Sequence, residues 1–128
     1  MEKRTIALTT VGVLVAGPAA LLVTAPAAQA DVDRGGVCGG GRYELSVDRE
    51  DGGYEVSVDL DRVAPGTRWR VVVRHDGKRI ASVVRTADRE GDVDVERVVR
   101  GTPGSETFRF TAKRVGTRTA CGATVTVA

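Results

Sequence analysis

Residues 43–60 read YELSVDREDGGYEVSVDL, and this stretch decides the fold class of the protein. Three apolar residues, Tyr43, Leu45 and Val47, alternate with polar ones. After a polar turn at 49–53, apolar and polar side chains alternate again to the end of the stretch. Because successive side chains of a β-strand point to opposite faces, a period of two predicts strands with one buried face.

The same alternation predicts five further strands along the chain. The seven expected strands cover residues 43–47, 54–60, 68–74, 79–86, 92–99, 107–113 and 121–127. Polar turns, several with Gly or Pro, separate them, and no segment shows helical periodicity. All the aromatic residues fall on apolar positions and are predicted core residues: Tyr43, Tyr54, Trp69, Phe108 and Phe110. The spacing predicts an all-β, seven-stranded sandwich.

The first thirty residues have the pattern of a secretory signal peptide. Lys3 and Arg4 precede an apolar stretch at 6–23, and Ala28 and Ala30 occupy the small-residue positions that signal peptidase reads. We therefore expect cleavage after the second alanine and a secreted, extracellular product with no membrane attachment. A retained anchor is the alternative, but a span needs about 20 mostly apolar residues, and a Gly-Pro pair interrupts this stretch.

After the signal peptide (residues 1–30), we expect a flexible lead-in at 31–36 and one sandwich domain at 37–128. The chain has two cysteines, Cys38 and Cys121. In an exported protein such a pair predicts a disulfide, with free or intermolecular thiols as the alternative. Two cysteines and one distant histidine do not make a four-ligand zinc set, so we expect no metal and no cofactor.

The order of features resembles an immunoglobulin-like or fibronectin-III-like sandwich over about residues 37–127. The third strand carries Trp69 and runs into a hairpin at 75–78, and the last two strands form a terminal hairpin. The chain also resembles small exported actinobacterial proteins without an assigned activity. Antibody-type domains bridge the second and sixth strands. Here the resemblance implies that the first strand runs parallel beside the last, with Cys38 and Cys121 in bridging reach.

Placing the strands on this frame separates the outward charges. One sheet would hold the first, second, fourth and fifth strands, and its outward residues are acidic: Glu44, Asp48, Glu55, Asp59, Asp92, Asp94 and Glu96. The other sheet would hold the third, sixth and seventh strands, with an outward basic face of Arg68, Arg70, Arg74, Arg109 and Lys113 beside Thr107, Thr111, Thr124 and Thr126. The formal net charge of only +2 argues against a general binder of nucleic acids or membrane surfaces.

The basic face is the candidate binding site. Arginine forks suit an anionic partner, either an acidic polymer of the cell envelope or an acidic protein surface. The alternative is that these are ordinary solvent-facing strand residues, which also discourage edge pairing.

Little in the chain points to catalysis. His75 lies in a hairpin turn beside Asp76 and has no neighbouring nucleophile, and no hydrolase or metalloprotease motif occurs. The acidic clusters at 48–51 and 88–94 are either weak Ca²⁺ sites or, as their interleaved arginines favour, solvated turns.

We therefore expect a non-enzymatic exported protein with a surface-binding or structural role. One alternative is a small-molecule carrier resembling the neocarzinostatin apoproteins in fold class, which a cavity in the core would favour. A second is an exported protease inhibitor that presents the loop at 101–105.

Overall fold

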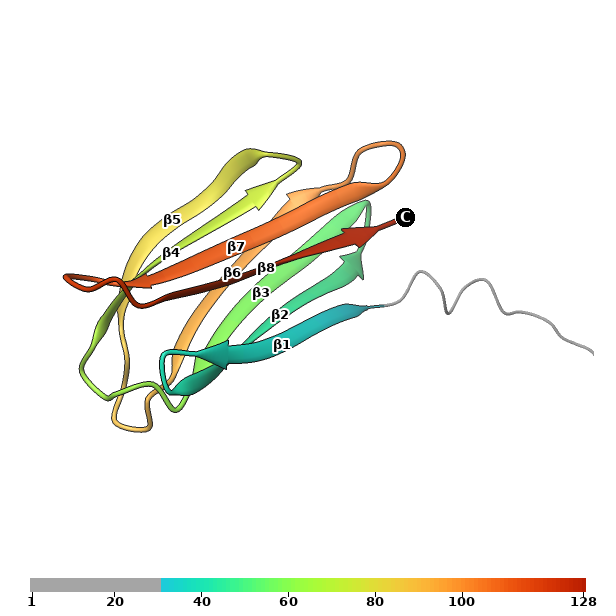
Figure 1. Cartoon of the computed structure of the whole chain (residues 1–128). Helices are drawn as coiled ribbons and strands as arrows, with labels where there is room; N and C mark the ends of the chain where they lie inside the picture. Colours follow the sequence, from blue (N-terminus) through green and yellow to red (C-terminus); the bar gives the residue numbers. More distant parts are fainter. Residues whose placement is uncertain (1–30) are drawn as a thin grey trace, which may run out of the picture. The chain divides into compact units, whose positions relative to one another are not determined.

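The computed structural model describes residues 31–128, and these form a β-sandwich of two antiparallel four-stranded sheets (Figure 1). The strands are β1 (Val32–Cys38), β2 (Gly41–Glu50), β3 (Gly53–Asp61), β4 (Arg68–His75), β5 (Lys78–Thr86), β6 (Val93–Arg100), β7 (Glu106–Arg114) and β8 (Ala120–Val127). Sheet A has the order β1-β2-β3-β6, and sheet B has the order β5-β4-β7-β8. The all-β sandwich prediction is confirmed, with eight strands instead of seven. The predicted signal peptide lies outside the described residues.

The additional strand is the segment predicted as a flexible lead-in at 31–36, and that prediction is wrong. β1 pairs with β2 along its whole length, from Val32 opposite Val47 to Cys38 opposite Gly41. This edge strand is held by its backbone pairing. It lacks the apolar alternation that predicts the other strands, and for that reason it was not predicted. A Cβ on its Gly36 would lie 2.6 Å from the Tyr43 ring, so the glycine leaves room for this ring to lie against the strand.

The fourth predicted strand is β5, and it lies in sheet B. The sequence predicted it in the sheet of the first, second and fifth predicted strands. It pairs with β4 in sheet B, because only Asp76 and Gly77 connect them and His75 lies directly opposite Lys78. Both turn residues have positive φ, 50° and 83°, as the tightest hairpin turns require. With β5 beside β4, the arrangement remains compatible with an immunoglobulin-like sandwich.

The core lies between the inner faces of the two sheets. Trp69, Phe108 and Phe110 are at most 1 % exposed. The Tyr54 ring meets Phe108 edge-on at 5.3 Å, and the partly buried Tyr43 ring lies 5.2 Å from Phe110. The predicted aromatic core is therefore present, with valines of both sheets packed around it.

The Cys38–Cys121 disulfide joins an edge strand of sheet A to an edge strand of sheet B, with a Cα–Cα distance of 5.3 Å. The bridged strands, β1 and β8, run in opposite directions in Figure 1. The first predicted strand is β2, which runs in the same direction as β8 in that view, but Cys38 lies on β1, the strand that was not predicted. The predicted pairing of the two cysteines is present. A bridge of this kind is compatible with an extracellular protein. Within residues 31–128, no helix is long and apolar enough to cross a membrane.

Candidate functional site

The outer face of sheet B gathers positive charge. All the predicted basic residues lie on β4 and β7 at outward positions, and only Arg74 is partly buried: Arg68, Arg70, Arg74, Arg109 and Lys113. The strand register places Arg70 directly opposite Lys113, and Arg74 directly opposite Arg109. The cations therefore stand in two rows across the sheet.

The pairing of β5 with β4 adds a cation that the sequence analysis missed. A register shift after Val73 brings Arg79 of β5 opposite Arg74, which makes a row of three arginines across β5, β4 and β7. The apolar pattern of residues 79–86 indicated a strand but not its partner. The hairpin length was the signal that could have placed Arg79 on this face.

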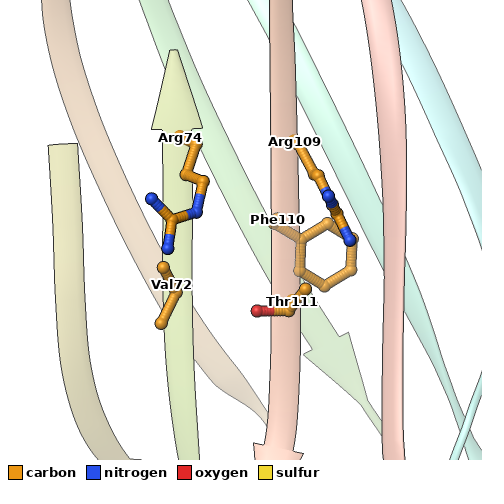
Figure 2. Close-up of a pocket in the computed structure, with 5 residues that line it drawn as sticks. All are labelled: Val72, Arg74, Arg109, Phe110 and Thr111. Atoms are coloured by element: carbon orange, nitrogen blue, oxygen red, sulfur yellow. The ribbon is translucent and has the colours of Figure 1, made fainter. Parts of the chain in front are cut away.

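A neutral strip separates the two rows of cations. It consists of Ser82, Val72, Thr111 and Gly122, which follow one another across the four strands. Val72 and Thr111 line a shallow depression of about 240 Å³ together with Arg74, Arg109 and Phe110. Figure 2 shows both guanidinium groups extending along their strands toward the neutral strip. A second depression, of about 410 Å³, continues from Arg109 and Thr111 over residues 120–124 of β8.

No acidic side chain among residues 31–128 balances this face. Glu106 is the only acidic residue in the four strands of sheet B, and it is buried at 2 % exposure. Within residues 31–128, the five basic residues take part in no ion pair. In this described part of the chain, the one hydrogen-bond partner of their charged groups is the Gly77 carbonyl oxygen, which accepts from Arg74 Nη1 at 3.4 Å. Like charges directly opposite each other destabilise a sheet, so a bound anion would relieve repulsion that the folded protein otherwise carries.

The outer face of sheet A carries the opposite charge. Glu44, Asp59 and Asp94 lie directly opposite one another across β2, β3 and β6. The expected acidic face survives the reassignment of β5 because none of its residues lies on that strand. Asp92 alone falls outside the strands, in the turn that precedes β6.

The pKa of Asp59, in the middle of this row, is raised to about 7. Partial burial is the largest cause, followed by a hydrogen bond with Asp94 and the negative charges of Asp94, Asp61 and Glu44. The folded protein therefore keeps a proton on Asp59 that the unfolded chain loses near pH 3.8. Stability falls as pH rises through this interval, and the penalty is fully present above pH 7.

Replacing Asp59 by asparagine should therefore raise the melting temperature most at pH 8, less at pH 5, and hardly at all below pH 4. The amide keeps the size of the protonated carboxyl and cannot ionise. Thermal unfolding followed by circular dichroism across this pH range measures the effect. The control is Glu96→Gln, in the neighbouring row opposite Ser57, which should not reproduce the pH dependence. A gain for Asp59→Asn that is equal at all pH values would contradict the prediction.

The acidic turn at 88–92 is held by hydrogen bonds between its own residues. Asp88 Oδ1 accepts the backbone N–H groups of Glu90 and Asp92, each at 2.9 Å. The three carboxylates are close together and exposed to solvent. The Asp88 side chain therefore closes the turn, as in an Asx-turn.

Comparisons of this chain with protein-family models, with curated proteins and with solved structures found no match. Its functional interpretation therefore rests on the fold and on the two charged faces.

Proposed function

We propose that this protein is exported, is not an enzyme, and binds an extended anionic polymer of the cell envelope through the outer face of sheet B. The observation that carries the proposal is the two rows of cations without ion-pair partners within residues 31–128, on either side of the neutral strip. An acidic protein patch is the alternative partner.

The spacing of the rows favours an extended ligand. Arg70 and Arg74 are four residues apart on β4, which separates the rows by about 13 Å at ~3.3 Å per residue. Within a row, neighbouring cations lie one strand apart, about 4.8 Å. A flexible chain with regularly repeated phosphate or carboxylate groups can meet both rows at once, whereas a single small anion meets only one. Guanidinium groups bind such oxyanions with paired hydrogen bonds.

Export is supported by the predicted signal peptide and by the disulfide, which is typical of oxidising compartments. A protein outside the cell membrane meets the anionic polymers of the envelope directly, so location and surface chemistry favour the same partner.

The triple substitution Arg70→Ser, Arg74→Ser and Arg109→Ser should weaken binding to linear polyphosphate by about 10–100-fold at low salt. The estimate allows ~0.5–1 kcal/mol for each exposed charge contact. Isothermal titration calorimetry over a series of NaCl concentrations measures the affinity. The dependence on salt should also become shallower in the variant.

The matched control changes three arginines outside sheet B: Arg89→Ser, Arg97→Ser and Arg100→Ser. This variant changes the net charge by the same amount as the first one, and it should keep most of the affinity for polyphosphate. Absence of binding by the unmodified protein at low salt, or equal losses in both triple variants, would overturn the proposal. Tighter binding to an acidic protein than to polyphosphate would favour the alternative partner.

A further inference from the structure

Three potential metal ligands meet at the end of the β4–β7 pair, away from the central strip of the basic face. His75 ends β4, Asp76 begins the hairpin turn, and Glu106 begins β7. His75 Nε2 lies 2.6 Å from Glu106 Oε1 and 3.7 Å from Asp76 Oδ2. One donor atom from each residue lies within 4.8 Å of the other two. We propose that His75, Asp76 and Glu106 bind a divalent transition-metal ion such as Zn²⁺.

The backbone and the core hold these side chains in place. The Asp76 N–H donates to the Thr107 carbonyl at 2.7 Å, which extends the β4–β7 pairing into the turn. Asp76 Oδ1 accepts the Thr107 N–H at 2.7 Å, so its Oδ2 is the oxygen near His75. The imidazole stacks on the buried Phe108 ring, with the ring centroids 4.5 Å apart and an angle of 1° between the ring planes. Ligands oriented in this way by surrounding groups are typical of metal sites.

The charge of the cluster favours a divalent ion. Glu106 is the only charged side chain that is fully buried within residues 31–128, and a buried carboxylate needs compensation. A protonated His75 would supply one positive charge against two carboxylates. Within the described residues, Glu106 Oε2 has no hydrogen-bond partner, because the bond to His75 uses Oε1. A divalent ion would balance both carboxylates and give the buried group a second interaction.

The donor set indicates the kind of ion. Ca²⁺ and Mg²⁺ take oxygen ligands, whereas an imidazole nitrogen with carboxylates suits Zn²⁺ and its neighbours. At Zn–ligand distances of about 2.0–2.2 Å, tetrahedral ligand atoms lie roughly 3.3 Å apart. The Nε2–Oε1 pair therefore has to open by about 0.7 Å, with the metal ion replacing the hydrogen-bonded proton. Three protein ligands leave one position for water.

The test uses untagged, oxidised protein, in which His75 is the only histidine. Calorimetric titration with ZnCl₂ should show one ion bound per chain, and the single set of imidazole NMR signals should shift on binding. Asp76→Asn should weaken Zn²⁺ binding at least about tenfold while leaving the fold intact, because asparagine keeps the oxygen that caps Thr107 and tolerates positive φ. Glu106→Gln should abolish the one-to-one binding.

The matched control is Asp88→Asn with Asp92→Asn, in the exposed acidic turn, which should leave the Zn²⁺ affinity unchanged. Unchanged imidazole signals at saturating Zn²⁺ would overturn the proposal. So would binding that survives Asp76→Asn but disappears in the control. Polyphosphate affinity should be the same in Asp76→Asn and in the unmodified protein, so the metal site and the polymer-binding face can fail independently.

Discussion

Reduction of the Cys38–Cys121 bridge should lower the melting temperature by about 15–40 °C. The bridge spans 83 positions of the sequence, and loop-entropy models assign a closure of this length about 4–5 kcal/mol. A domain of this size is stable by only ~5–15 kcal/mol, and each 1 kcal/mol corresponds to about 4–8 °C. Thermal unfolding with and without a reducing agent measures the loss.

The double variant Cys38→Ala with Cys121→Ala is the control for this experiment. It should melt at the temperature of the reduced protein, and the reducing agent should not change it further. If the reduced protein and the double variant both had the melting temperature of the oxidised protein, the bridge would contribute no stability and the prediction would be wrong.

Truncation of Phe110 to alanine should lower the free energy of unfolding by about 3–5 kcal/mol. Phe110 lies in the middle of β7, is fully buried, and packs against the Tyr43 ring of sheet A. Removing it leaves a cavity between the sheets that the surrounding strands can only partly fill. Urea unfolding monitored by Trp69 fluorescence measures the loss of free energy.

Two variants bracket this result. Phe110→Leu keeps much of the buried volume and should lose clearly less free energy than the alanine variant. Val98→Ala removes a side chain that is 72 % exposed on β6 and should change stability by no more than about 0.5 kcal/mol. Similar losses for Phe110→Ala and Val98→Ala would show that the inter-sheet core is not as described.

Most of the fold could be predicted because its strands have one buried and one exposed face. The alternation around Leu45, Val58 and Phe110 identifies β2, β3 and β7, and the same pattern predicts which side chains enter the core. β1 was missed because it has no such alternation: its Asp33, Arg34 and paired glycines read as a loop, and pairing with β2 makes it a strand.

The candidate sites divide in the same way. Alternation along β4 and β7 was enough to place Arg70, Arg74 and Arg109 outward, because the pattern within one strand shows which of its side chains share a face. Arg79 joined them only through the register between β5 and β4. The partnership of His75 with Glu106, which are 31 positions apart, follows from pairing of β4 with β7 and had no local signal.

The sequence by itself determined the strand pattern, the buried aromatic residues and the outward cations, because these depend on neighbours two residues apart in one strand. Only the tertiary structure decided the sheet that holds β5, the opposite directions of the bridged strands, the rows of like charge and the cluster around Glu106. Each of these depends on which strands pair and in which register, and pairing is a contact between residues far apart in the chain.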